Sequence, residues 1–112
     1  MDEMAVTQSV VDAVADRVPD GRVAVVHLEV GRLSGVLADA VAFCFDVLAQ
    51  GTPAEGAALE ISQPPGVYRC RACGTRMEGD DLLRLCACGS AELEVVSGTE
   101  LRVTSVEVRE DA

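Results

Sequence analysis

Four cysteines in the second half of the chain could hold a metal ion. They form two close pairs, Cys70 with Cys73 and Cys86 with Cys88, and twelve residues separate the pairs. Thiolates at this spacing can converge on one tetrahedral zinc ion, as in zinc ribbons. The second pair is tighter than usual, because one residue rather than two lies between its cysteines. The pattern predicts a structural Zn(II) held by all four thiolates.

A glycine directly follows each cysteine pair, Gly74 after the first and Gly89 after the second. The turn that aims backbone N–H groups at a bound thiolate often forces the next residue to positive φ, where only glycine is unstrained. A thiol redox role for Cys70 and Cys73 is an alternative, but a redox C-x-x-C normally begins a helix in a thioredoxin-like fold. The glycines and the turn-rich surroundings favour zinc.

Composition excludes several classes of function. The chain has 112 residues, a formal net charge of −10 and no lysine, so we expect no nucleic-acid partner. Its acidic N-terminus lacks the basic and apolar segments of a signal peptide, and no apolar run approaches membrane-spanning length. Because the cysteines look like metal ligands rather than a disulfide framework, the sequence predicts a cytoplasmic protein with no membrane partner.

The elements that position the cysteines follow from the hydrophobic pattern. In chain order we expect a helix over residues 3–18, a strand over 22–31, a helix over 37–50, a strand over 57–62, an extended segment over 91–97 and a strand over 100–109. Alternation in the last strand changes parity, which predicts a β-bulge near Thr104 and Ser105.

This order predicts an α+β fold, with two helices packed on a small mixed three-stranded sheet and an inserted zinc-ribbon module. Composition changes where the cysteines begin, and Pro64-Pro65-Gly66 marks a boundary there. We expect one domain over residues 1–64 plus 95–112, and the inserted ribbon over residues 65–94.

Two further residues invite a metal-binding role but are predicted to be structural. His27 is the sole histidine, and it lies inside a predicted strand on the same face as Glu29, so we expect it to be half-exposed. Cys44 lies between two phenylalanines on the apolar side of the second helix, where Leu37 is also expected, so we predict that it packs in the core. No nucleophile–base pair or phosphate-binding glycine loop is apparent, and we expect no enzyme activity.

Nearly the whole chain resembles the HypA/HybF family, the nickel metallochaperones of [NiFe]-hydrogenase maturation. The matching segments are Met1–Met4, Gln8–Val11, Leu28–Ser34, Phe43–Asp46, Gly51–Ala57, the four cysteines, Leu93–Gly98 and Glu100–Val103. The resemblance implies a transient Ni(II) cargo at the N-terminus and a structural Zn(II) in the ribbon. It also implies two partners, a HypB-type GTPase and the hydrogenase large subunit, and in some organisms service to urease. We expect a monomer or a weak homodimer.

The resemblance places the nickel site at Met1, Asp2 and Glu3, where the family motif is Met-His-Glu. Ni(II) favours square-planar nitrogen donors, and Asp2 offers a carboxylate oxygen in place of the imidazole. We therefore expect weakened nickel binding or a further ligand; a zinc-ribbon adaptor that has lost nickel delivery is the alternative. Asp2 is also a good helix N-cap. In the zinc site, the family register puts the third ligand at Leu85, and Cys86 is the nearest replacement.

Overall fold

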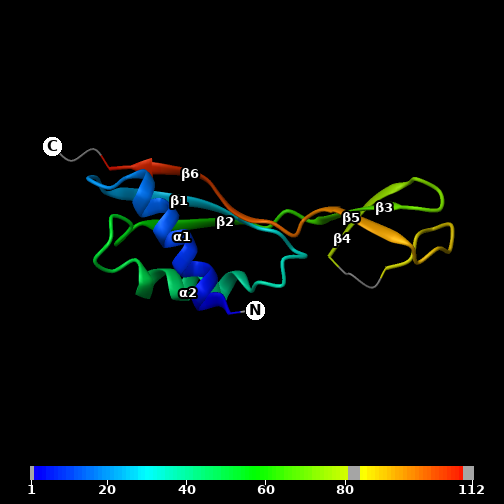
Figure 1. The fold of residues 1–112 in the computed structure, drawn as a ribbon, viewed down its shortest axis with the longest axis horizontal. Coiled ribbons are helices and arrows are strands. Elements are labelled where there is room, and N and C mark those ends of the chain that lie inside the picture. The colour runs from blue at the N-terminus through cyan, green and yellow to red at the C-terminus, as the bar shows by residue number, and fades with distance from the viewer. Residues whose placement is uncertain (1, 81–83, 110–112) are drawn as a thin grey trace.

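The computed structural model describes residues 2–80 and 84–109, which form two modules joined end to end (Figure 1). The molecule is elongated, with extents of 59 × 25 × 17 Å. Its elements are α1 (Glu3–Arg17), β1 (Val23–Val30), α2 (Ala38–Leu48), β2 (Ala58–Ser62), β3 (Gly66–Cys70), β4 (Arg76–Gly79), β5 (Leu93–Ser97) and β6 (Leu101–Val108). The larger module contains α1, α2, β1, β2 and β6, and the smaller module contains β3, β4 and β5.

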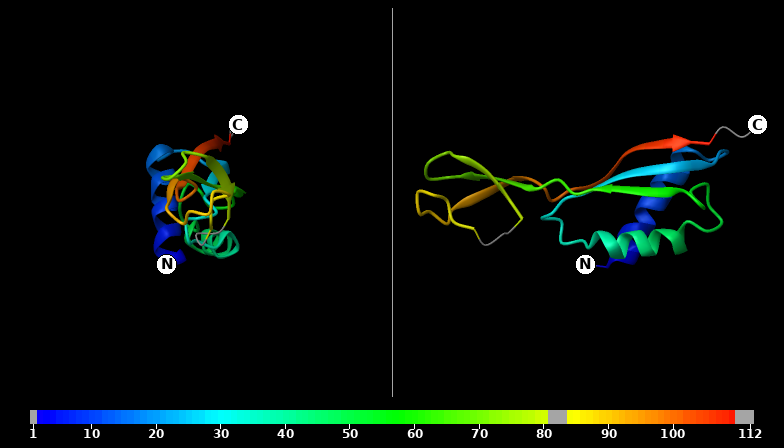
Figure 2. Two further views of the ribbon diagram at one scale, coloured as in Figure 1. Left: turned by 90° about the vertical axis from the view of Figure 1, so that its right-hand side faces the viewer. Right: turned by 180° about the vertical axis from the view of Figure 1, so that it is seen from behind.

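The larger module is a mixed three-stranded sheet covered by both helices (Figure 2). The strand order is β2-β1-β6, with β1 parallel to β2 and antiparallel to β6. Helix α2 carries the chain from β1 to β2, because parallel neighbours cannot be joined by a tight hairpin. The predicted fold class is confirmed.

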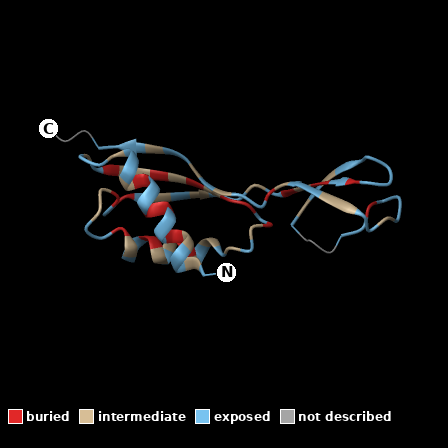
Figure 3. Cartoon of the chain, viewed as in Figure 1, coloured by how far each residue is buried: buried red, intermediate tan, exposed pale blue. Residues whose placement is uncertain are grey.

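A core of aliphatic side chains lies between the helices and the sheet, where Figure 3 shows the buried residues in red. Both helices contribute to it, since Val11 of α1 and Phe45 of α2 pack in one cluster with Val26 of β1. Val41 of α2 packs in a second cluster with Leu28. Each such side chain contributes about 1.5–3 kcal/mol on burial, so this module has a core of its own.

Two β-bulges set which side chains of the sheet face the helices. His27 pairs with Ser105 but Leu28 pairs with Val103, so Thr104 is the extra residue. This confirms the bulge predicted in the last strand. The second bulge is on β1, where one extra residue lies between Val23 and Val25. It turns Val23 into the core with no exposed surface, whereas plain alternation from His27 would put that residue on the outer face.

The buried face of α2 differs from the predicted one. Val41, Phe45 and Ala49 are buried, but Leu37 precedes the helix and is 70% exposed. Cys44 is only partly buried and lies beside the core rather than in it. The expectation that Leu37 and Cys44 pack in the core was therefore wrong, because the sheet meets α2 from a direction that helical periodicity alone leaves open.

The smaller module is a second three-stranded sheet, in the order β4-β3-β5 and antiparallel throughout. Its three strands lie between residues 66 and 97. Strands β3 and β4 were not individually predicted, because each is short and lacks clear alternation. The domain boundaries expected after residues 64 and 94 stay a prediction.

The two modules meet at a neck, formed by residues 31–33, 64–66 and 98–100, where backbone segments pack directly on one another. A Cβ atom on Gly98 would lie 2.6 Å from the Gly66 Cα, and one on Gly31 would overlap the Gly98 carbonyl. The Leu33 N–H donates to the Gly98 carbonyl at 2.8 Å, and the Gly31 N–H donates to the Glu100 carbonyl at 2.8 Å. Only glycine fits such an approach.

The Glu100 side chain also supports the neck. Its Oε2 accepts the Gly98 N–H at 3.0 Å. The pKa of Glu100 is lowered, first by its own backbone N–H and then by that of Gly98. A carboxylate that accepts backbone N–H groups is stabilised in its charged form, so this loop is held by an ionised acceptor.

Replacing Gly98 tests how tight the neck is. Gly98 has φ of +104° and a crowded Cβ position, whereas Gly35 has φ of +78° and nothing within 4 Å. Gly35→Ala carries only the backbone strain and is expected to lower the free energy of unfolding by about 1 kcal/mol. Gly98→Ala adds the overlap and is expected to cost about 3 kcal/mol or more. Urea unfolding followed by circular dichroism measures both, and equal losses would show that the neck has room for a side chain.

Candidate metal centre

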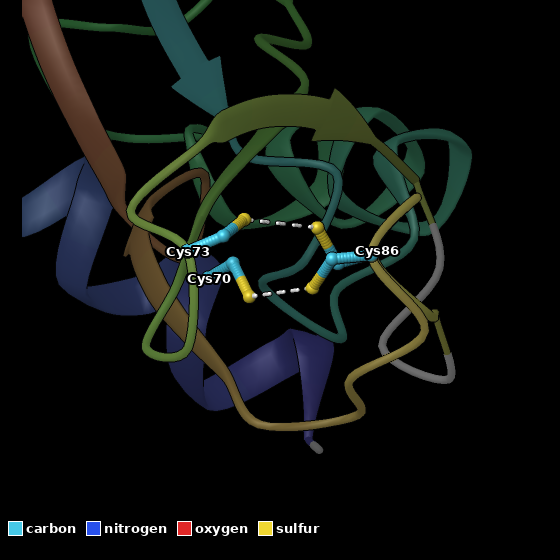
Figure 4. A group of neighbouring side chains, drawn as sticks. Cys70, Cys73 and Cys86 are labelled. Atoms are coloured by element: carbon cyan, nitrogen blue, oxygen red, sulfur yellow. Dashed lines mark hydrogen bonds between the residues drawn. The ribbon is translucent and has the colours of Figure 1, made fainter.

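The four cysteines predicted to bind zinc meet at the end of the smaller module away from the neck. Cys70 ends β3 and Cys73 lies in the turn before β4, while Cys86 and Cys88 come from the loop that precedes β5. Their four sulfur atoms all lie within 4.8 Å of one another. Figure 4 shows the sulfurs of Cys70 and Cys73 pointing across the gap between the two loops, toward the side of Cys86.

The spacing of the sulfurs fits a tetrahedral zinc ion. The Cys70 and Cys88 sulfurs are 3.7 Å apart, and the Cys73 and Cys86 sulfurs are 3.6 Å apart. Zinc–sulfur bonds of about 2.3 Å place neighbouring sulfurs of a tetrahedron about 3.8 Å apart. A disulfide needs about 2.05 Å, and all five cysteines of the chain are free thiols. The cluster could therefore hold a zinc ion.

Each cysteine pair is closed by a turn that ends at its glycine. Gly74 has φ of +78° and donates its N–H to the Cys70 carbonyl at 2.8 Å. Gly89 has φ of +92° and donates to the Cys86 carbonyl at 2.9 Å. The second turn spans one residue fewer, yet no described residue other than glycine has positive φ. The left-handed glycines expected from the sequence are confirmed, and the tight second pair causes no such strain.

The thiols of the cluster have pKa values shifted in opposite directions. The pKa of Cys73 is lowered to about 6, first by the hydrogen bond between its sulfur and the Thr75 hydroxyl. The pKa of Cys86 is raised to about 12: the Cys88 N–H lowers it, but burial and the neighbouring thiols outweigh that effect. Four thiolates this close repel one another unless a cation balances them. A divalent metal ion would supply that charge.

The structure brings Cys86, and not Leu85, to the other three cysteines. The Leu85 side chain is 64% exposed, while Cys86 is 5% exposed and directed at the other sulfurs. The geometry gives no support to the redox alternative. Cys70 and Cys73 flank a turn between two strands, and both described helices lie in the larger module.

The N-terminal residues begin α1 at the side of the larger module shown by the N label in Figure 1. Met1 lies outside the described residues. Asp2 is the N-cap of α1, and its Oδ1 accepts the Met4 N–H at 3.0 Å. The predicted capping role is confirmed. Glu3 is the first helical residue, and its carbonyl accepts the Thr7 hydroxyl at 2.6 Å.

His27 does not approach the N-terminus. Its side chain is 33% exposed on the outer face of the sheet, and its Nε2 lies 2.6 Å from Glu107 Oε2. The half-exposed strand position is confirmed. Within the described ranges, the cysteine cluster is the only group of three or more histidine, cysteine or acidic side chains placed to share an ion.

Two side-chain contacts, one to Cys73 and one to His27, were not predicted from the sequence. Thr75 follows the first cysteine–glycine pair and shifts the pKa of Cys73, a role that its position next to Gly74 could have suggested. Glu107 is 80 positions from its partner His27, and only the register of β1 against β6 brings them together. No described helix is long and apolar enough to cross a membrane.

Comparison with known proteins identifies the family. Residues 1–108 match the family described as "Hydrogenase/urease nickel incorporation, metallochaperone, hypA". The chain is 41% identical over 110 residues to the hydrogenase maturation factor HypA of Nostoc sp., covering 98% of this chain and 97% of that one. It is 44% identical over 109 residues to HypA of Geobacter metallireducens, covering 96% and 99%.

A solved structure has the same fold. The solution structure of the Ni metallochaperone HypA from Helicobacter pylori superposes with a TM-score of 0.68 at 20% identity, over 99% of this chain and all of that one. The four convergent thiols and the two cysteine–glycine turns are consistent with the family match over residues 1–108. The chain belongs to the HypA family of hydrogenase maturation metallochaperones.

Proposed function

We propose that this chain delivers Ni(II) to a [NiFe]-hydrogenase during its maturation and carries a structural Zn(II) in the smaller module. HypA proteins are maturation metallochaperones rather than enzymes. The observation that carries the proposal is the family match over residues 1–108, supported by the four-sulfur cluster. Service to a urease is a further proposal that rests on the family description alone.

We place the nickel cargo at Met1, Asp2 and Glu3. The first N–H groups of a helix have no intrahelical acceptor, so the Glu3 amide nitrogen can bind nickel and release its proton to solvent without breaking a helical hydrogen bond. The Asp2 carboxylate already accepts the Met4 N–H as the N-cap of α1. Using it as a ligand would cost the cap, about 1 kcal/mol. The proposed donors are therefore mainly backbone nitrogens, which hold nickel less tightly than a set that includes an imidazole.

We place the zinc at Cys70, Cys73, Cys86 and Cys88, as a structural ion. Among the described residues of the smaller module, the buried hydrophobic ones are Tyr68, Cys70 and Cys86. So small a core does not sustain a fold without a crosslink or a metal. Zinc would supply that stability and would also balance the thiolate charge.

The proposed setting is the cytoplasm, with a HypB-type GTPase and the hydrogenase large subunit as partners. A second candidate function is an adaptor that keeps the zinc ribbon and has lost nickel delivery. One observation favours it: Asp2 stands where the family motif has histidine. Nickel affinity separates these two candidates.

Nickel titration tests the assignment at residue 2. Asp2→His restores an imidazole donor and is expected to raise nickel affinity at least about tenfold, or ~1.4 kcal/mol. Asp2→Asn is the matched control, because asparagine caps a helix as well as aspartate but offers no carboxylate. The d–d absorption band of bound Ni(II) reports each affinity.

Equal nickel affinities in the original protein and Asp2→His would contradict the assignment. A single-residue extension before Met1 displaces the amine and is expected to remove the square-planar d–d band altogether. An unchanged band in the extended chain would place nickel elsewhere. Absence of nickel binding in the original protein alone would favour the adaptor.

Zinc removal tests the structural role of the cluster. Cys88→Ser is expected to lose the zinc equivalent and the amide-exchange protection of residues 66–97, because the small core cannot hold that sheet alone. The larger module should keep its helical circular dichroism. Cys44→Ser, outside the cluster, is the control and should retain one zinc. Metal analysis with hydrogen exchange measures both, and full protection of the smaller module in zinc-free Cys88→Ser would refute the structural role.

A further inference from the structure

Strand β6 is an edge strand of the larger module. It pairs with β1 on one side, and no described strand pairs with its other side. Five of its eight residues are exposed, among them the apolar Val108, and its other apolar residues, Leu101, Val103 and Val106, are half-buried. A free edge of this length is a template for another strand.

The sequence of β6 is self-complementary when it is read antiparallel to a second copy of itself. With the two-fold axis between Thr104 and Ser105, each residue meets a chemically matching one. The pairs are Leu101 with Val108, Arg102 with Glu107, Val103 with Val106, and Thr104 with Ser105. Apolar groups meet apolar groups, hydroxyls meet hydroxyls, and opposite charges face each other, which are the favourable cross-strand combinations.

The bulge at Thr104 makes this register possible. In a regular strand, Val103 and Val106 would lie on opposite faces, and pairing them would bury one and expose the other. Because Thr104 is an extra residue, both valines pack against the core cluster on the inner face. Arg102 and Glu107 both contact partners on the outer face, Glu29 at 2.8 Å and His27 at 2.6 Å. The Val103–Val106 pair therefore lies on the inner face of a continuous sheet, and the Arg102–Glu107 pair lies on the outer face.

A groove lies beside this edge, between β6 and α1. Its apolar lining comes from Val10, Ala13 and Val14 of α1 and from Leu101, Val103 and Val106 of β6, and its polar lining is Ser9, Arg17, Arg102, Thr104 and Ser105. The three apolar residues of β6 that line it are only half-buried. A second β6 in the proposed register would present its own Val106 and Val103 to this face and extend the apolar layer across the two-fold axis.

We propose that this chain self-associates by antiparallel pairing of β6 with β6 of a second copy, giving a continuous six-stranded sheet. On the outer face, Arg102 of one copy then lies between its own Glu29 and Glu107 of the second copy, and that Glu107 also contacts its own His27. The two-fold axis repeats this row of side chains. The chain carries −10 overall, and this repulsion keeps the association weak and makes it stronger as salt screens the charge. The occupant of the edge is a second copy because the edge matches itself residue by residue.

Charge reversal in the pair tests the register. Arg102→Glu and Glu107→Arg each place two like charges opposite each other in the homodimer, and each is expected to weaken association by about tenfold or more. In a mixture of the two variants, the new Glu at position 102 faces the new Arg at position 107 at one site, and the original Glu107 faces the original Arg102 at the other. Opposite charges therefore meet at both sites, and heterodimers should form. Arg76→Glu, in the smaller module, changes the net charge in the same direction and by the same amount as Arg102→Glu, and it should leave association as in the original protein.

Sedimentation equilibrium over a range of concentrations measures each association constant, and native mass spectrometry identifies heterodimers by mass. Thermal unfolding of each variant at low concentration confirms that the monomers are folded despite losing the contacts to Glu29 and His27. Heterodimer formation by two variants that fail to self-associate supports the proposal. A monomeric original protein at the highest concentration, or a dimer unaffected by either reversal, overturns it.

Discussion

The direct packing of backbone on backbone at the neck is the constraint on which the rest of the molecule depends. The chain crosses there twice, on the way into β3 and on the way back to β6, and the loop after β1 packs against both passages. Gly31, Gly66 and Gly98 leave no space for a side chain between these segments. The hydrogen bonds across the neck align the two sheets end to end, which gives the molecule its length of 59 Å.

The two modules are stabilised in different ways. The larger one buries aliphatic side chains of α1, α2 and β1 in two clusters, so it resembles an ordinary two-layer domain. Among its described residues, the smaller one buries few hydrophobic side chains beyond Tyr68 and two of its cysteines. The turn between β3 and β4 and the loop before β5 come together where four sulfurs meet. The division follows the chemistry of the sequence, since aliphatic residues dominate one module and thiols with turn glycines dominate the other.

The proposed nickel site and the proposed zinc site depend on separate local features of the chain. At the N-terminus, Asp2 caps α1, and the unsatisfied amides of the first helical turn give the proposed nickel site its nitrogen donors. In the ribbon, turn glycines hold the thiols at zinc-binding distances. The neck lies between these two sites. If the proposed nickel site is right, a change at residue 2 is expected to alter nickel binding while the cysteine cluster keeps its geometry.

Local patterns in the sequence predicted local structure well. Helical periodicity predicted α1 and α2, the cysteine–glycine pairs predicted the two left-handed turns, and a change of parity predicted the bulge at Thr104. Features that depend on pairing between distant segments escaped prediction. The burial of Val23 and the contact between His27 and Glu107 follow from the register of β1 against β6. The three-glycine neck requires segments distant in sequence to meet, and no local pattern encodes that.

Native mass spectrometry of the zinc-loaded chain during stepwise addition of Ni(II) would show whether this chain carries nickel and zinc at separate sites, because it counts both metals on one molecule. We expect one zinc per chain and, as nickel is added, one further nickel with the zinc retained. Displacement of zinc by nickel would place the cargo at the cysteines instead of the N-terminus. Zinc-loaded protein that never takes up nickel would contradict nickel delivery by this chain.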